Sequence, residues 1–293
     1  MIVILTALAV EQEAVLAHLV DVREHRHTQG TFFDVGALAG HPGRQVAVGV
    51  TGQGTLAAAT LTERAVAEFS PAAVLFVGVA GGLREWLEIG DVVVGTKVYA
   101  YHGGKSTDEA FLARPQAWAI SHELEQVARR VQRARKWHEP LAPPGEAQAP
   151  EVYFEAIAAG DVVLDSRASS VAHALHHNYN DAVAVEMESA GFAAAGHLAG
   201  RVATATVRGI SDHADGSKSV TDRRGGQQRA ARNAAAFAVA LAAVAPERTR
   251  TAGSRAKPVP SVSFGTFTQN AGTVGQQNGV NTGDFHMNLG EKR

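Results

Sequence analysis

The chain has 293 residues, 45% of them hydrophobic, and its 27 Lys and Arg against 29 Asp and Glu residues give a formal net charge of −2. This composition excludes disorder of the whole chain, and the near-neutral charge makes a small molecule a more natural partner than nucleic acid or a membrane. The absence of cysteine excludes disulfides, thiolate nucleophiles and Cys-ligated metals, and fits a cytoplasmic protein. The chemistry must therefore use carboxylates, histidines or hydroxyls.

Short apolar runs alternate with longer amphipathic segments, which is typical of a sheet wrapped by helices. The first run lacks the basic leader of a signal peptide and is too short to span a membrane. The predicted strands are Ile2–Leu8, Phe32–Leu38, Gln45–Val50, Ala73–Val79, Asp91–Tyr101, Ala182–Glu186 and Ala203–Ile210. The predicted helices are Glu11–Leu19, Gly54–Phe69, Gln116–Trp137, Ala168–His177, Ser189–Ala199 and Gly226–Val244. Together they predict one α/β domain over residues 1–245, with proline-rich Leu141–Pro150 as a surface loop.

The composition changes after residue 245. Residues 246–260 carry three prolines and four basic residues without apolar periodicity, which predicts a flexible linker. Residues 261–293 are rich in Gly, Asn, Gln and Thr, and they are too polar to form a globular core. We expect a disordered tail, or one that stacks between identical copies as cross-β layers.

Three glycine-containing turns follow predicted strands, at Thr51–Gly54, Gly78–Gly82 and Gly209–Asp212. Open α/β sheets bind ligands at strand ends, where glycine lets backbone N–H groups approach closely, although glycine also serves plain turn geometry there. None of the turns has the dinucleotide or phosphate-loop spacing. Nicotinamide and nucleoside triphosphatase chemistry are therefore not expected.

Carboxylates close two of the predicted strands. Glu186 and Glu188 flank Met187, and strand alternation places both glutamates on one face. At the other strand, the run Arg208–Asp212 ends in an aspartate. Buried carboxylates are costly unless they are paired or used, so both places are candidate sites. Solvated strand ends, helix caps or ion pairs are the alternatives. The thirteen histidines stand at no recognised ligand spacing, so we expect no metal.

Five motifs in this order resemble the nucleoside phosphorylase superfamily, and most nearly its methylthioadenosine/S-adenosylhomocysteine nucleosidase branch. They are Ala7–Glu11, Gly52–Gly54, Gly78–Leu83 followed by Ile89–Val94, Val185–Ser189 and Arg208–Asp212. The resemblance covers roughly residues 1–245. It implies a single three-layer α/β domain with a central mixed, partly barrel-like sheet flanked by helices, working as a homo-oligomer on a purine nucleoside or nucleotide.

Cleavage of an N-glycosidic bond needs an acid on the leaving base, a nucleophile at the anomeric carbon and a clamp on the ribose. The resemblance implies that Asp212 is the acid, oriented by Ser211, and that Glu11 activates water. It places Glu188 on the ribose hydroxyls and Met187 beneath the sugar. The other substrate-binding residues that it implies are Gln53, Val79, Ala80, Gly81, Val163, Leu164, Glu186 and Arg208. No cofactor is implied; the co-substrate is water, or phosphate in a phosphorylase.

Two departures from the family pattern concern the substrate. Val79 stands where the family commonly has serine, and aliphatic Val163 and Leu164 replace an aromatic wall beside the base. In addition, basic residues follow Asp212 where the resemblance places the end of the sugar, and they favour a phosphorylated substrate unless they are merely solvated. These candidate phosphate contacts are Lys218, Arg223 and Arg224, with Arg229 nearby.

The segment Thr268–Gly283 resembles bacterial amyloid signalling motifs related to the RIP homotypic interaction motif. This resemblance implies an effector that assembles with a receptor protein bearing a matching motif, in a defence or cell-death circuit. An ordinary disordered tail is the alternative. A housekeeping nucleosidase, which needs no tail, and a phosphate-dependent phosphorylase remain the alternative enzymes. A pseudoenzyme is disfavoured because Glu11, Glu188 and Asp212 are all retained.

Overall fold

The computed structural model describes residues 1–141, 149–200 and 202–246. The predicted tail, all but the first residue of the predicted linker and most of the predicted loop Leu141–Pro150 lie outside the described residues. The strands are β1 (Ile2–Thr6), β2 (Leu19–Arg26), β3 (Phe32–Leu38), β4 (His41–Val50), β5 (Ala73–Gly82), β6 (Val92–Ala100), β7 (Gly104–Ser106), β8 (Phe111–Ala113), β9 (Gln116–Ala119), β10 (Val152–Ala159), β11 (Ala182–Glu186) and β12 (Ala203–Asp212). The helices are α1 (Ala9–Leu16), α2 (Thr55–Phe69), α3 (His122–Ala134), the 3-10 turn η1 (Lys136–His138), α4 (Ser170–Asn178), α5 (Ser189–Ala199), α6 (Lys218–Arg223) and α7 (Gly226–Val244).

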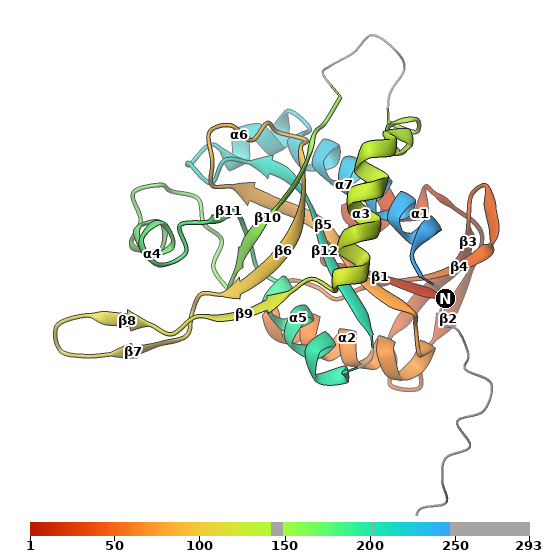
Figure 1. The fold of residues 1–293 in the computed structure, drawn as a ribbon, viewed down its shortest axis with the longest axis horizontal. Coiled ribbons are helices and arrows are strands. Elements are labelled where there is room, and N and C mark those ends of the chain that lie inside the picture. The colour runs from red at the N-terminus through yellow and green to blue at the C-terminus, as the bar shows by residue number, and fades with distance from the viewer. Residues whose placement is uncertain (142–148, 201, 247–293) are drawn as a thin grey trace, which may run out of the picture. The chain divides into compact units, whose positions relative to one another are not determined.

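Within the described residues, one mixed sheet of ten strands runs through the molecule in the order β11-β10-β6-β12-β5-β1-β4-β3-β2, with β9 beside β6. Strand β11 also pairs antiparallel with β5, through Val185 opposite Gly81 and Ala184 opposite Gly82. This extra pairing closes β11, β10, β6, β12 and β5 into a ring, while the remaining strands extend from it as an open flank (Figure 1). The predicted mixed, partly barrel-like sheet is confirmed.

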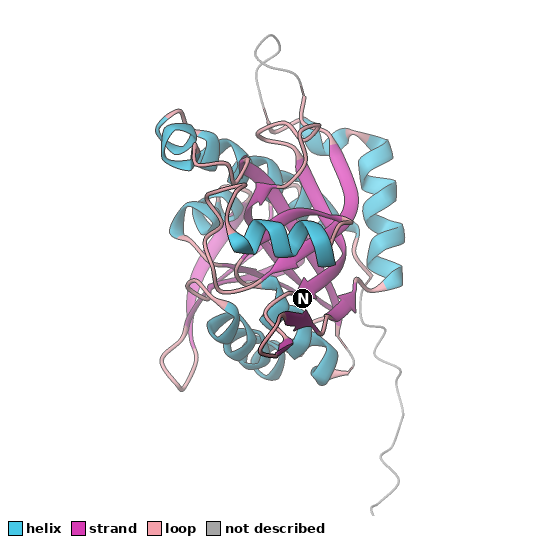
Figure 2. Cartoon of the chain, turned by 90° about the vertical axis from the view of Figure 1, so that its left-hand side faces the viewer, coloured by secondary structure: helices cyan, strands magenta, loops and turns pink. Residues whose placement is uncertain are grey.

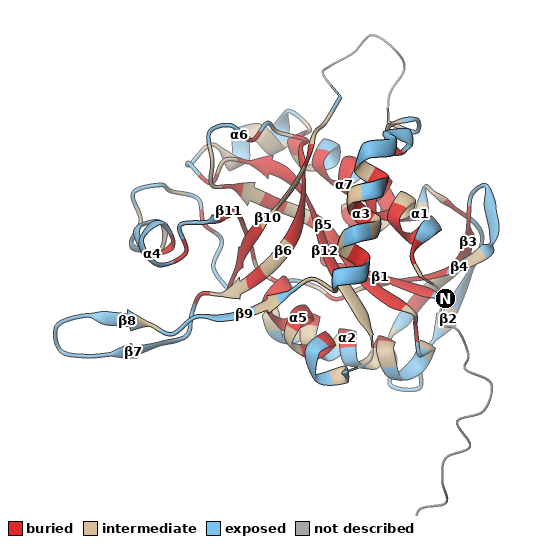
Figure 3. Ribbon diagram, in the orientation of Figure 1, coloured by how far each residue is buried: buried red, intermediate tan, exposed pale blue. Residues whose placement is uncertain are grey.

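Helices cover both faces of the sheet, as the side view in Figure 2 shows. Alternation along β1 explains this layering, because successive side chains point to opposite faces. Ile2 and Ile4 pack in one cluster with residues of α3 and α7, whereas Val3 and Leu5 pack in another with Ala58 of α2 and Phe192 of α5. The central strands are accordingly buried on both sides (Figure 3). The predicted three-layer domain is therefore confirmed.

Helices α2 and α5 cross at very close range. A Cβ atom on Gly191 of α5 would overlap the carbonyl oxygen of Thr55, the first residue of α2. Glycine at this position lets the two helices meet where their N-terminal ends approach the ring. The described helices include none that is long and apolar enough to cross a membrane.

The structure corrects several predicted elements. The predicted helix Gln116–Trp137 is too long, because β9 pairs with β6 over Gln116–Ala119 and α3 begins only at His122. That helix ends where Arg135 takes a left-handed conformation, at φ +55°. Strand β2 was not predicted, because it is an almost wholly exposed polar strand without an apolar pattern. Strands β7, β8 and β10 and helix α6 were also not predicted.

Candidate active site

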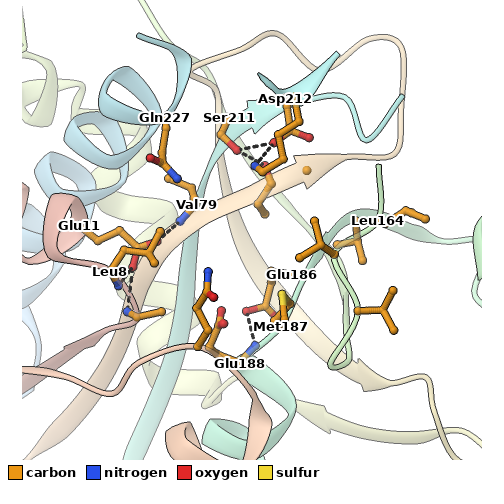
Figure 4. A pocket seen from close by; sticks show the side chains of 18 residues that line it. Leu8, Glu11, Val79, Leu164, Glu186, Met187, Glu188, Ser211, Asp212 and Gln227 are labelled. Carbon is orange, nitrogen blue, oxygen red and sulfur yellow. Dashed lines mark hydrogen bonds and ion pairs between the residues drawn. The ribbon is translucent and has the colours of Figure 1, made fainter. Parts of the chain in front are cut away.

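A cavity of about 110 Å³ opens at the ends of strands β5, β11 and β12, next to the start of α1 (Figure 4). It is lined by every predicted site residue except three. Those that line it are Glu11, Gln53, Val79, Ala80, Gly81, Val163, Leu164, Glu186, Met187, Glu188, Ser211, Asp212 and Lys218. Arg208, Arg223 and Arg224 are not part of the lining. Residues that the sequence did not predict also contribute to the wall: Ala7, Leu8, Val162, Val185 and Gln227.

Glu11 enters the cavity from the first turn of α1. Its Oε2 accepts hydrogen bonds from the backbone N–H groups of Ala7 and Leu8, at 2.8 and 2.9 Å. Its Oε1 accepts one from Val79 N–H at 2.8 Å, so a single carboxyl joins α1 to β5. Burial raises the pKa of Glu11, while the charge of Arg208 and the backbone donors oppose the increase. A carboxylate with raised proton affinity suits the role of a general base.

Room for this carboxyl depends on Gly78 of β5. A Cβ atom there would lie 2.5 Å from Glu11 Oε1 and would also collide with the guanidinium of Arg208. The glycine turn at Gly78–Gly82 therefore has a steric purpose beyond turn formation. It allows an acidic side chain and a basic side chain to approach the same point of the strand.

Arg208 of β12 is fully buried beneath the cavity rather than in its wall. Its Nη2 donates to Glu186 Oε2 and, at 3.0 Å, to Ser189 Oγ, and it lies 3.6 Å from Glu188 Oε2. The guanidinium carbon also stands 4.7 Å from the centroid of the Phe76 ring. Arg208 thus acts as the counter-ion of buried carboxylates and, unlike most of the predicted substrate-binding residues, does not line the cavity.

Glu186, the last residue of β11, holds the turn that follows it. Its carboxylate accepts hydrogen bonds from the backbone N–H groups of Glu188 and Ser189 and from Ser189 Oγ, at 3.0 to 3.2 Å. Burial raises the pKa of Glu186, and the charge of Arg208 opposes this. Because these contacts occupy both oxygens, Glu186 orients the turn that carries Met187 and Glu188.

Glu188 lies at the start of α5 and reaches across to α2. Its Oε1 accepts a hydrogen bond from Gly54 N–H at 3.1 Å, and the residue is only 5% exposed. Thr55 Oγ1 donates to the Met187 carbonyl at 3.2 Å, so the same turn is tied twice to the beginning of α2. Met187 itself is only half-buried and lines the cavity between Glu186 and Glu188 (Figure 4).

Asp212, at the end of β12, occupies the opposite wall from Glu188 (Figure 4). Its Oδ2 accepts a hydrogen bond from Ser211 Oγ at 2.8 Å, and its Oδ1 accepts one from Ala214 N–H at 3.0 Å. Lys218 Nζ stands 2.8 Å from Oδ2 and completes an ion pair, with the lysine side chain 30% exposed. Three donors thus hold the Asp212 carboxyl in place.

The basic residues after Asp212 do not gather at the cavity. Lys218 lines it, but Arg223 and Arg224 at the end of α6 are exposed and lie outside the lining. Arg229 of α7 donates to the carbonyl oxygen of Ile89. The structure therefore brings only one of the three candidate phosphate contacts to the pocket.

Among the described residues, no group of three or more His, Cys, Asp or Glu side chains is arranged to hold a metal ion.

The sequence model of the Phosphorylase superfamily matches residues 1–243 of the chain. The chain belongs to this superfamily. The resemblance drawn from the five sequence motifs is confirmed at that level.

Relatives within the Phosphorylase superfamily include 5'-methylthioadenosine/S-adenosylhomocysteine nucleosidases. That of Actinobacillus succinogenes is 28% identical over 220 residues, which cover 73% of this chain and 86% of the relative. That of Chromohalobacter salexigens is 28% identical over 221 residues, covering 72% and 83%. These relatives agree with the predicted N-ribosyl hydrolase.

Solved structures share the fold of this superfamily member. The nucleosidase of Neisseria meningitidis, in complex with methylthio-immucillin-A, superposes with a TM-score of 0.68 at 23% identity, covering 82% of this chain and 97% of the other. Futalosine hydrolase of Helicobacter pylori superposes with a TM-score of 0.66 at 23% identity, covering 82% and 96%. The shared architecture therefore extends over nearly the whole of both relatives.

Proposed function

We propose that the protein is an N-glycosidase that hydrolyses the bond between base and ribose in purine nucleosides or nucleotides. One observation carries the proposal: the carboxyl groups of Glu11, Glu188 and Asp212 line a single cavity from three different elements. Scission of this bond needs a group at the leaving base, a group on the ribose and a nucleophile at the anomeric carbon. Three separated carboxyls match these three demands.

Asp212 is the group at the leaving base in this proposal, oriented by Ser211. In the structure it is an acceptor, so it must bind a proton before it can donate one to the base. Lys218 forms the 2.8 Å ion pair with Asp212 at the rim of the cavity, where its side chain is 30% exposed. The wall made by Val163 and Leu164 would contact the face of the base, beside Asp212.

Glu188 is the ribose clamp, and Glu11 is the base that activates water. Gln53, Val79, Ala80 and Gly81 line the same cavity, and Met187 would provide an apolar surface under the sugar. Deprotonated Glu11 accepts a proton from water while the oxocarbenium-like sugar forms. The raised pKa of Glu11 increases its affinity for that proton.

Hydrolysis is favoured over phosphorolysis by the charges at the nucleophile site. A phosphate anion placed beside Val79 N–H would stand next to the carboxyl of Glu11, which already accepts that hydrogen bond. The guanidinium of Arg208, which might otherwise balance phosphate, is paired with Glu186 and Glu188. A water molecule meets no such repulsion, so water is the proposed co-substrate and a phosphate-dependent phosphorylase is the alternative.

Adenine nucleosides are the proposed substrates, because the curated relatives are named as nucleosidases of methylthioadenosine and S-adenosylhomocysteine. The same names support the alternative of a housekeeping nucleosidase. Lys218, the remaining basic side chain of the predicted group at the pocket, is the proposed contact for a substrate phosphate. We further propose a homo-oligomeric, cytoplasmic effector of bacterial defence or cell death, which assembles on a receptor through residues 261–293.

The test is a chromatographic assay of base release by purified enzyme from adenosine, methylthioadenosine, AMP and ATP, with and without phosphate. We expect free adenine and free sugar at the same rate whether phosphate is present or not. Asp212→Asn should reduce turnover by about 100- to 10,000-fold, because a positioned general acid contributes that much. A sugar 1-phosphate that forms only when phosphate is added would identify a phosphorylase, whereas the 5'-phosphate of AMP and ATP stays on the sugar in either reaction. Wild-type turnover in Asp212→Asn would refute the assignment of the acid.

A further inference from the structure

A second cavity of about 190 Å³ lies beside the candidate active site. Leu164 lines both cavities and forms part of the partition between them. Ala214, whose N–H donates to Asp212 at 3.0 Å, also lines the second cavity. The second cavity therefore lies directly behind the proposed wall for the base and next to the proposed acid.

The inner wall of the second cavity is apolar. Leu164, Leu175, Tyr179, Ala182 and Ala214 line it, and they belong to one hydrophobic cluster that also contains Val185, a residue of the first cavity. The phenol of Tyr179 is directed elsewhere, since it donates to the carbonyl of Tyr101 at 3.3 Å. Tyr179 therefore presents its ring, and not its hydroxyl group, to the cavity. An aromatic ring favours contact with an apolar or aromatic ligand.

The charged groups at the outer rim of the second cavity are paired. Arg167 and Glu85 form an exposed ion pair at 3.3 Å, and Arg84 donates to the carbonyl of Asn180. The buried Nδ1 of His213, by contrast, has no hydrogen-bond partner among the described residues. The lining thus combines an apolar body with charged side chains that are hydrogen-bonded at its rim and with one ring nitrogen that has no partner.

We infer that the second cavity is a subsite for an apolar substituent on the edge of the base that points away from the sugar. The inference rests on the proposed function, which places the ribose between Glu11 and Glu188 and the base between Asp212 and Leu164. Figure 4 shows Leu164 on the side of the pocket away from Glu11. A substituent on the 6-amino group of adenine would continue past Leu164 and Ala214 into the second cavity.

The test compares adenosine with N6-benzyladenosine as substrates of the wild-type enzyme and of a variant with a filled cavity. If another sugar proves better in the assay above, the same pair is made on that sugar. Ala172→Phe fills the cavity from α4, where Ala172 is partly buried in the lining. Ala174→Phe is the matched control, because Ala174 lies exposed on the same helix and outside the lining.

We expect the wild type to cleave both nucleosides with kcat/KM values within about tenfold of each other. Ala172→Phe should lower kcat/KM for the benzyl compound by about tenfold or more, a usual size for loss of pocket space, and leave the parent nucleoside within about twofold. Ala174→Phe should change neither value. Leu83→Trp fills the cavity from the end of β5 and should repeat the selective loss, which guards against misfolding of the first variant.

Calorimetry with the free bases reads the same subsite without turnover. N6-benzyladenine should bind the wild type at least as tightly as adenine does, and Ala172→Phe should weaken only the benzyl base. Cleavage of adenosine with no acceptance of either benzyl compound overturns the subsite and leaves the proposed function standing. No base release from any parent nucleoside overturns the proposed function and the subsite with it.

Discussion

Three buried glutamates surround one buried guanidinium at the floor of the site. Arg208 contacts Glu186 and Glu188 directly, and its charge also lowers the proton affinity of Glu11. Burial disfavours charged carboxylates, and one cation cannot neutralise three of them. Burial accordingly raises the pKa of both Glu11 and Glu186. A surplus of carboxyl groups over cations is costly to bury, and it suits the proposed task of stabilising a cationic sugar.

Glu11→Gln should abolish catalysis and change how stability depends on pH. Because the pKa of Glu11 is raised in the folded protein, this carboxyl keeps its proton to a higher pH there than in the unfolded chain, where its pKa has the ordinary value of 4.5. Deprotonation thus destabilises the folded wild type as pH rises above that value, and glutamine does not titrate. The melting temperature of the variant minus that of the wild type should therefore increase from about pH 5 to about pH 8.

Thermal melts across this range check the expectation, and base release should fall about 100- to 10,000-fold. Glu13→Gln is the control, because Glu13 lies exposed on the same helix. A difference in melting temperature that decreases with pH would contradict the buried, proton-retaining state of Glu11.

Glu188→Gln should weaken the discrimination between ribose and 2-deoxyribose. A carboxylate that accepts ribose hydroxyls forms charge-assisted hydrogen bonds of about 1.5–3 kcal/mol each, and a neutral amide forms weaker ones. The ratio of kcat/KM for adenosine and 2'-deoxyadenosine measures this, with exposed Glu85→Gln as control. Equal ratios in the wild type and in Glu188→Gln would show that Glu188 does not bind the ribose hydroxyls.

The acidic site residues could be predicted because their motifs are local. Glu186 and Glu188 follow directly on an apolar strand, and Asp212 ends another. The ion pair of Lys218 with Asp212 could not, because it depends on the path of a loop and short helix without apolar periodicity. Gln227 likewise reaches the pocket only through the placement of α7.

At the scale of elements, the close contact of α2 and α5 positions Glu188, the proposed ribose clamp. At the beginning of α2, Gly54 N–H donates a hydrogen bond to Glu188, and Thr55 N–H donates one to Asp161 at 2.8 Å. Asp161 immediately precedes the segment with Val162, Val163 and Leu164, which lines the cavity. A displacement of α2 would therefore reach the sugar and the wall of the base together.

Gly191→Ala should produce such a displacement. The new methyl group would overlap the Thr55 carbonyl, and overpacking of this kind typically costs about 1–3 kcal/mol. We expect a lower free energy of unfolding in urea and a higher KM. Gly43→Ala is the matched control, because a Cβ atom there meets nothing within 4 Å. If Gly191→Ala is destabilised but keeps the wild-type KM, the packing of α2 against α5 does not control substrate binding.

The elements that the sequence predicted well are those with strong apolar patterns, such as β1, β5, β11 and β12. Helix α4 begins at Ser170 instead of Ala168 because Ser169 caps it, with its Oγ accepting Ala172 N–H at 3.1 Å. Strands β2 and β9 escaped prediction because their exposed side chains carry little apolar signal and their pairing partners lie elsewhere in the chain.

At the scale of the whole molecule, catalysis and the proposed assembly should be separable. All residues that line the candidate site lie between Ala7 and Gln227. Deletion of residues 261–293 should therefore leave kcat/KM in dilute solution unchanged. Base-release assays of the full chain and the deletion variant measure this, and a large loss of turnover in the deletion variant would place the tail in the catalytic unit.

The peptide 261–293 should form fibrils with cross-β spacing, because Gln and Asn side chains can stack in ladders. Gln277→Asp should suppress this, since like charges would repeat about every 4.8 Å along the fibril. Fibre diffraction and thioflavin fluorescence are the measurements. Asn288→Asp, which also introduces an aspartate but outside Thr268–Gly283, is the control and should still assemble. A peptide that stays monomeric at high concentration would reduce the tail to an ordinary polar end.

The closed ring of strands has a consequence for motion. Strand β5 pairs with β1, β12 and β11, so the backbone around Gly78–Gly82 cannot be released by fraying of a sheet edge. In native-state hydrogen exchange, the ring amides of β5 and β12 should exchange only with global unfolding, and those of the exposed strand β2 by local opening. The floor of the pocket is thus expected to stay folded through many rounds of substrate entry and product release.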